Sequence, residues 1–175
     1  HNKIIMFDFL VKWKINSAFR DNKRKHAFRN LESMKSVLIL FSYNDWPAMD
    51  AISKDLAANG KKVILWTYQS TKKAPGNTIF PANVRIIHPQ EMSFLQILAP
   101  SLLNEFKALE YDTLIDLTTT ESKVYEYLLA HNSSEFSIGI AKPDQPYYDF
   151  LVLKTDEMNL QETYQQIKNY LSKVL

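Results

Sequence analysis

The sequence contains no cysteine and only three glycines among its 175 residues. The absence of cysteine excludes disulfides, thiolate nucleophiles and cysteine-based zinc sites. The glycines, Gly60, Gly76 and Gly139, lie too far apart to form the G-x-G-x-x-G or G-x-x-x-x-G-K-[ST] motifs, in which glycine lets the backbone approach a phosphate. Standard dinucleotide and P-loop sites are therefore excluded, and the sequence predicts no cofactor.

Long apolar runs are also absent, because no segment approaches the ~20 continuous apolar residues of a transmembrane helix. Apolar residues make up 46% of the chain and charged residues 23%, which is typical of a globular domain. The net charge of only +2 does not indicate a nucleic-acid-binding protein. Together with the lack of cysteine, these features lead us to expect a cytoplasmic protein.

Charge is distributed unevenly along the chain. The first 35 residues hold nine Lys and Arg against three Asp and Glu, a net charge of +6, whereas the other 140 hold twelve against sixteen, a net charge of −4. An apolar stripe with spacings of three and four predicts an amphipathic helix over residues 3–20. The stripe consists of Ile4, Phe7, Val11, Ile15 and Ala18. We therefore divide the chain into a basic helical extension, residues 1–35, and a single α/β domain, residues 36–175.

The apolar face of this leading helix is wide, because Met6, Phe9, Leu10 and Trp13 flank the stripe. We expect that the following domain leaves part of it uncovered. Three surfaces remain as alternatives for packing on this apolar face: the chain's own sheet, a second copy or protein partner, and an anionic membrane. The first two are favoured. The basic cluster from Arg20 to Arg29 is either a solvated face or a phosphate contact. Nucleic acid is not favoured, because no aromatic platform or helix-turn-helix accompanies the charge.

From residue 36 onward, short apolar runs alternate with helical patterns. The predicted strands are 36–41, 62–68, 84–87, 112–117, 136–141 and 149–154, and the predicted helices are 45–59, 100–109, 121–131 and 160–174. Residues 89–100 are ambiguous. This alternation predicts a three-layer α/β/α sandwich around a mostly parallel, Rossmann-like or flavodoxin-like sheet, preceded by the amphipathic basic helix.

Four segments in this order resemble a known group of proteins. They are the apolar strand at 37–41, the phrase YDTLIDLT at 111–118, the strand SIGI at 137–140 and the YYD element at 147–149. Together with the basic leading helix and the closing amphipathic helix, they are similar to an uncharacterised conserved family of Bacteroidetes. The resemblance implies an α/β fold and a domain of unknown function, and it brings no catalytic residues.

Two turns predict a ligand site, because open α/β sheets bind ligands beyond the carboxyl ends of their strands. One turn holds Asn44, Asp45 and Trp46, and the other holds Thr118, Thr119 and Glu121. Both precede helices and supply hydroxyls, carboxylates and backbone N–H groups that suit a small polar or anionic ligand. In the structural alternative, Asn44 or Asp45 and Thr119 or Thr120 cap the helices, and Trp46 packs on the sheet.

The sequence favours a binding or interaction module without a demonstrable catalytic residue. The alternative is an enzyme or sensor for a small anionic or nucleotide-related ligand in the predicted crevice. No metal site is predicted, since none of the four histidines has a ligand pattern around it. Asp112 and Asp116 are interpreted as a turn residue and a hydrogen-bonded residue at a strand end, in preference to a general acid and base.

Overall fold

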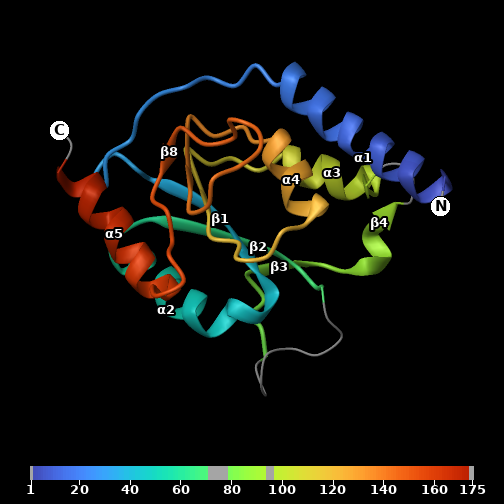
Figure 1. Cartoon of the computed structure of the whole chain (residues 1–175). Helices are drawn as coiled ribbons and strands as arrows, with labels where there is room; N and C mark the ends of the chain where they lie inside the picture. The colour runs from blue at the N-terminus through green and yellow to red at the C-terminus, as the bar shows by residue number, and fades with distance from the viewer. Residues whose placement is uncertain (1, 71–78, 94–96, 174–175) are drawn as a thin grey trace.

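The computed structural model describes residues 2–70, 79–93 and 97–173, and the side chains from Ile5 onward within these ranges. Six strands form one sheet in the order β3-β2-β1-β6-β7-β8, and every neighbouring pair is parallel (Figure 1). These strands are β1 (Ser36–Ser42), β2 (Lys62–Tyr68), β3 (Val84–Ile87), β6 (Thr113–Asp116), β7 (Phe136–Gly139) and β8 (Phe150–Leu151). The predicted α/β class and parallel sheet are confirmed.

Strand β1 lies at the centre of the sheet because it is apolar on both faces. Side chains alternate between the faces of a strand, so Leu38 and Leu40 point to one layer while Val37, Ile39 and Phe41 point to the other. All five are completely buried. A strand of this kind belongs between two helical layers.

Helices cover both faces of the sheet (Figure 1). The layer of α2 (Trp46–Ala58) and α5 (Leu160–Lys173) packs with Val37, Ile39 and Phe41. The opposite layer packs with Leu38 and Leu40. It consists of α1 (Asn2–Asp21), α3 (Pro100–Lys107) and α4 (Lys123–Ala130). The result is the predicted three-layer arrangement.

The chain reverses its direction across the sheet between β1 and β6, which are hydrogen-bonded neighbours. Counted within this sheet alone, the strand order is 3-2-1-4-5-6, the doubly wound arrangement whose ligands bind beside such a reversal. Residues 140–149, which connect β7 to β8, contain no helix. This connection runs on the α4 side of the sheet, where Tyr147 joins the core.

The ambiguous residues 89–100 contain a short 3-10 turn, η2 (Pro89–Glu91), and a small antiparallel pair of strands, β4 (Met92–Ser93) and β5 (Ile97–Leu98). The sequence did not predict this pair, since two residues are too few to show a strand period. The last strand was predicted at 149–154, but only Phe150–Leu151 is paired as a strand.

Helix α1 confirms the predicted leading helix and packs on the domain through one side. Ile15 is only 2% exposed, and Val11, Ala18 and Phe19 pack around it on the α4 layer. Residues 22–35, which we call the strap, then run back along the domain to β1 (Figure 1). Within the described residues no helix is long and apolar enough to cross a membrane.

Candidate functional site

A cavity of about 630 Å³ opens at the carboxyl ends of β6 and β7. Residues 118–123, which lead into α4, form one wall, and residues 140–144 with Tyr147 and Tyr148 form another. It lies on the β7 side of the 118–122 turn, and no residue of β1 lines it. This is the end of the sheet at which doubly wound proteins bind ligands.

Asp116 ends β6 and contributes to the cavity lining, although it is only 4% exposed. Its Oδ1 accepts hydrogen bonds from the backbone N–H of Thr118 (3.0 Å) and from the Thr118 hydroxyl (2.7 Å), and its Oδ2 accepts one from the hydroxyl of Tyr148. Burial raises the pKa of Asp116, while these hydrogen bonds act in the opposite direction. The interpretation of Asp116 as a hydrogen-bonded residue at a strand end is confirmed.

Gly139 gives Tyr148 access to Asp116. In the register of the sheet, Gly139 of β7 lies beside Asp116 of β6. The ring of Tyr148 lies so close over Gly139 that a Cβ there would overlap it. Burial raises the pKa of the Tyr148 hydroxyl, and the neighbouring Asp116 raises it further. Tyr148 was not among the predicted site residues, although a glycine inside a strand pattern is a known sign of a close approach.

The two predicted turns lie beside each other and are joined by hydrogen bonds. Ser42, at the end of β1, accepts from the backbone N–H groups of Thr119 (3.0 Å) and Thr120 (3.3 Å). The Thr119 hydroxyl donates to Oδ2 of Asp45 at 2.5 Å. The two turns predicted to form one crevice are therefore in contact at Asp45 and Thr119. These bonds join the turns, and the cavity lies on the other side of residues 118–122.

The six predicted ligand-binding residues have different surroundings. Asn44 is exposed and Asp45 half-buried, whereas Trp46 is buried and packs against the rings of Phe41 and Phe80. None of these three predicted residues lines the cavity. The predicted residues that line it are Thr118, Thr119 and Glu121.

The alternative interpretation of these residues is confirmed in part. Trp46 packs on the sheet as expected, and Asp45 occupies the N-cap position of α2, although its side chain makes no capping hydrogen bond. Helix α4 is capped by Ser122, whose Oγ accepts from the backbone N–H of Val124 (3.2 Å), so neither Thr119 nor Thr120 is the cap. Tertiary contacts replace the expected capping bonds. Asp45 accepts from the Thr119 hydroxyl, and Ser42 accepts from the N–H groups of Thr119 and Thr120.

Charged side chains of both signs line the cavity. Lys123 pairs with Glu126 at 2.8 Å, and the ammonium group of Lys154 donates to the carbonyl of Thr155 at 3.3 Å. The start of α4 adds the positive end of a helix dipole to this wall. The charged lining residues are Lys123, Lys142, Lys154, Glu121, Glu126, Asp144, Asp156 and the buried Asp116.

Comparison with known protein families gives one match, which covers residues 8–174. The chain belongs to DUF6913, a family of unknown function. The resemblance to a family of unknown function is thereby confirmed. No curated protein and no solved structure matches this DUF6913 chain.

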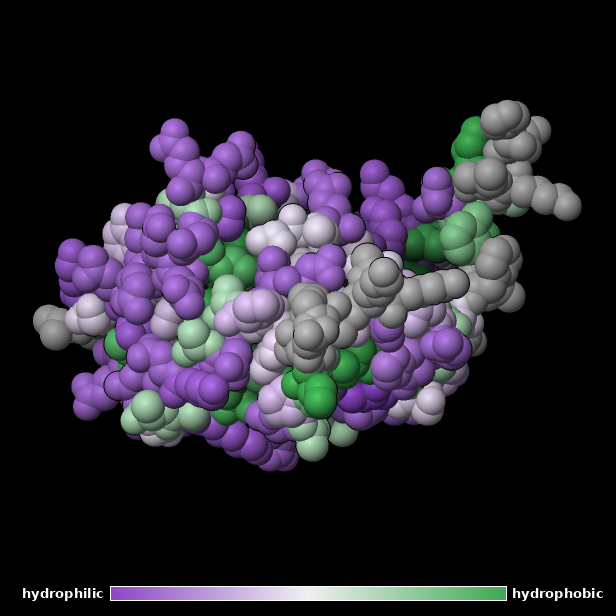
Figure 2. All heavy atoms as spheres, turned by 90° about the horizontal axis from the view of Figure 1, so that it is seen from below, coloured by the Kyte–Doolittle hydropathy of each residue, from purple (hydrophilic) through white to green (hydrophobic). Residues whose placement is uncertain are grey.

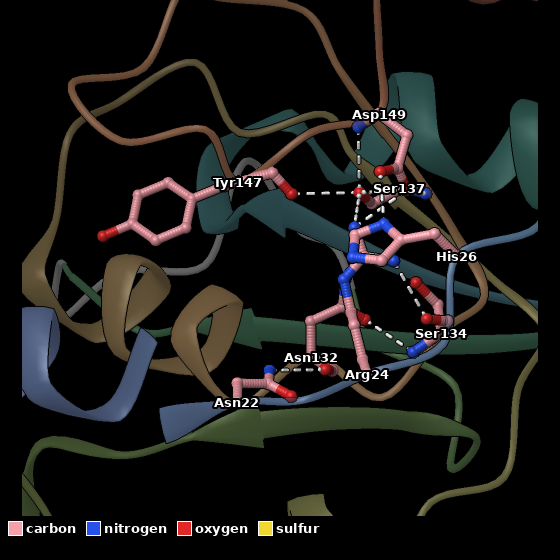
Figure 3. A network of polar contacts seen from close by, with 8 residues as sticks. All are labelled: Asn22, Arg24, His26, Asn132, Ser134, Ser137, Tyr147 and Asp149. Atoms are coloured by element: carbon pink, nitrogen blue, oxygen red, sulfur yellow. Dashed lines mark hydrogen bonds and ion pairs between the residues drawn. The ribbon is translucent and has the colours of Figure 1, made fainter. Parts of the chain in front are cut away.

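A second polar network fixes the strap of the DUF6913 chain to β7 and to the start of β8 (Figure 3). Arg24, whose side chain is only 9% exposed, donates to the carbonyl of Ser134 (3.0 Å), to the hydroxyl of Ser137 (3.0 Å) and to Asp149 (2.8 Å). His26 contacts the other carboxylate oxygen of Asp149 at 2.8 Å. Burial alone would raise the pKa of Asp149, but the hydrogen bonds from Arg24 and His26 lower it.

The basic cluster of the strap is thus partly used within the chain. Arg29 donates to Glu135 at 2.6 Å, and Lys25 lies 4.0 Å from the same carboxylate. With Arg24 bonded to Asp149, neither a wholly solvated basic face nor a free phosphate-binding cluster describes this segment. Within the described part of the DUF6913 chain, no group of three or more His, Cys, Asp or Glu side chains could hold a metal ion.

Proposed function

We propose that this DUF6913 protein is a binding module whose ligand is a small polar molecule with an anionic group, such as a phosphate or a nucleotide. The observation that carries the proposal is the cavity of about 630 Å³ at the carboxyl ends of β6 and β7. Its volume lies within the range of small-molecule sites. Like the ligands of doubly wound sheets, it lies beyond the carboxyl ends of parallel strands.

Two cations of the lining support an anionic group. Lys123 begins α4, where the positive end of the helix dipole lies, and Lys142 belongs to the other wall. Carboxylates such as Asp144 and Asp156 could accept hydrogen bonds from hydroxyl or amino groups on the rest of the ligand. A mixed lining of this kind fits a polar molecule with one charged end better than a purely apolar one.

Binding is proposed in preference to catalysis because the buried acid of the site is already engaged. Both carboxylate oxygens of Asp116 accept hydrogen bonds, from Thr118 and from Tyr148. A general acid or base must reach a substrate atom within hydrogen-bond distance. Asp116 and Tyr148 instead hold the floor of the cavity in one arrangement, which favours a preformed binding site.

A thermal-shift screen of the full chain tests the proposal. The panel contains inorganic phosphate, nucleoside mono-, di- and triphosphates and sugar nucleotides. We expect at least one compound to raise Tm in a saturable manner, since a ligand present at 100 times its Kd stabilises a folded protein by about 2.7 kcal/mol. A panel in which no compound changes Tm would contradict the proposal.

Variants then locate the response in the molecule. Ala141→Trp places a bulky ring in the cavity lining, and Lys142→Glu reverses a cation there, so both should abolish the Tm response to the active compound. Lys54→Ala is the matched control, because Lys54 is exposed on α2 and pairs only with Asp50 among the described residues. If Ala141→Trp and Lys142→Glu respond like Lys54→Ala, the ligand binds elsewhere and the proposal fails.

A further inference from the structure

Helix α1 is apolar on two opposite sides. Ile15 and its neighbours pack on the domain, whereas the other side carries five large apolar side chains in the solvent. They are Ile5 (67% exposed), Met6 (64%), Phe9 (67%), Leu10 (47%) and Trp13 (56%), and we call them the outer strip. Figure 2 shows green, hydrophobic side chains at the upper right, on the side where α1 begins in Figure 1.

The outer strip is large enough to be an interface. With roughly 100 Å² of exposed apolar area for each side chain, it presents roughly 500 Å², the size at which a patch on a monomer is often functional. Two such strips facing each other would bury roughly 1,000 Å² in total, which reaches the lower limit for a specific protein interface.

Charges beside the outer strip favour a second copy of the chain as the occupant. Asp8 and Lys12 are exposed, lie one helical turn apart on the same edge of α1, and have no ion-pair partner among the residues that the structure describes. A two-fold axis near Leu10, midway between them, would bring Asp8 of each copy opposite Lys12 of the other. An anionic membrane would attract Lys12 but repel Asp8, whereas a second copy gives both an opposite charge.

We propose that the outer strip pairs two copies of this chain, with their α1 helices antiparallel. The axis that matches Asp8 with Lys12 also brings Trp13, the bulkiest residue of the strip, near Met6, a flexible side chain that adapts to its neighbour. Self-complementarity of this kind is what a two-fold interface requires. The domain packs on the other side of α1, so the two bodies lie on opposite sides of the helix pair.

Sedimentation equilibrium of the full chain tests the proposal first. We expect a monomer–dimer equilibrium, and a loss of the dimer in Phe9→Asp and Trp13→Asp. Both residues are exposed, so thermal unfolding at low protein concentration should show that the variants fold. Leu153→Asp is the matched control, since Leu153 is equally exposed (55%) but lies outside α1, and this variant should still dimerise. A wild-type chain that remains monomeric at every concentration would overturn the proposal.

A charge exchange tests the antiparallel register. Lys12→Asp and Asp8→Lys each bring two pairs of like charges together, so the dimer Kd should rise roughly tenfold in each. The double variant restores opposite charges and should return Kd to near its wild-type value. If the double variant is no tighter than the single ones, the register is wrong. A wild-type monomer that pellets with anionic phosphatidylserine vesicles would assign the strip to a membrane surface and overturn pairing.

Discussion

The ring of Tyr148 lies in the space that a side chain at Gly139 would fill, and its hydroxyl reaches across β7 to Asp116. The two residues belong to different segments, one in the sheet and one in the connection that follows it. Their packing positions the 140–148 wall of the cavity relative to β6. The shape of the candidate site therefore depends on residue 139 being a glycine, which has no Cβ.

Gly139→Ala should destabilise the fold by about 1 to 3 kcal/mol, because the added methyl group must displace the Tyr148 ring from a packed position. Urea unfolding measures this cost. In a Tyr148→Ala background the same substitution should cost much less, since the ring it displaces is gone. Costs that simply add in the double variant would show that the two residues are not coupled.

Asp116 should make stability fall with rising pH. Burial raises its pKa in the folded state above the ordinary value, so the folded state holds the proton more tightly than the unfolded chain. This contribution is complete below about pH 4 and is lost as the pH rises through the folded pKa, by up to about 1.4 kcal/mol per pH unit. Asp116→Asn lacks this dependence.

The measurement is urea unfolding of the wild type and of Asp116→Asn between pH 4 and pH 8. The stability of the wild type relative to the variant should decrease across this range. A difference that stays constant, or that grows with pH, would show that the pKa of Asp116 is not raised in the folded protein.

Asp149 should show the opposite pH dependence. Its pKa is lowered by Arg24 and His26, so its contribution is present above about pH 4 and is lost as the pH falls through the folded pKa. At pH 7, Asp149→Asn should cost about 3 kcal/mol, because it leaves the largely buried Arg24 without its carboxylate. Lys25→Ala is the control and should cost about 0.5 kcal/mol or less, since Lys25 is 81% exposed.

Urea unfolding of both variants between pH 2.5 and pH 7 measures these effects. The cost of Asp149→Asn should shrink toward the acid end, where the wild-type carboxyl is protonated as well. A cost that is independent of pH would assign the effect to packing and not to the ion pair with Arg24.

Ser42→Ala should release the turn that forms one wall of the cavity. The substitution leaves the N–H groups of Thr119 and Thr120 without their acceptor and should cost about 1 to 3 kcal/mol. Hydrogen exchange of the Thr119 amide should become faster. Ser53→Ala is the control, because the Ser53 hydroxyl only donates to a carbonyl of its own helix, and unchanged protection of Thr119 in Ser42→Ala would contradict the role of Ser42.

Local patterns in the sequence predicted most of the fold. The apolar run of β1 and the apolar stripe of α5 are local sequence patterns. Their period and length therefore identify these elements without tertiary information. The order of the strands could not be predicted in this way, because it depends on which strands pair with each other in the folded sheet. The short pair β4–β5 was missed for a related reason, since its two strands have two residues each.

The candidate site was only partly predictable. The turn at 118–121 was found because it follows an apolar strand, but the cavity lies toward β7, and this could be known only from the sheet order. The opposite wall comes from the 140–148 connection, which has no regular period. Partners such as Arg24 and Asp149 are 125 residues apart and carry no local signal of their contact.

Residues that lie far apart in the sequence, such as Arg24 and Asp149, are synthesised at different times. The side chains of Asn22 and Arg24 bond to positions between 130 and 149, so these partners do not exist while the first two thirds of the chain are synthesised. At 5 to 20 residues per second, roughly 6 to 25 s pass between the synthesis of Arg24 and that of Asp149. Until α3 and α4 are synthesised, the Ile15 side of α1 has no helical layer to pack on, so the nascent chain exposes an apolar helix of the kind that chaperones bind.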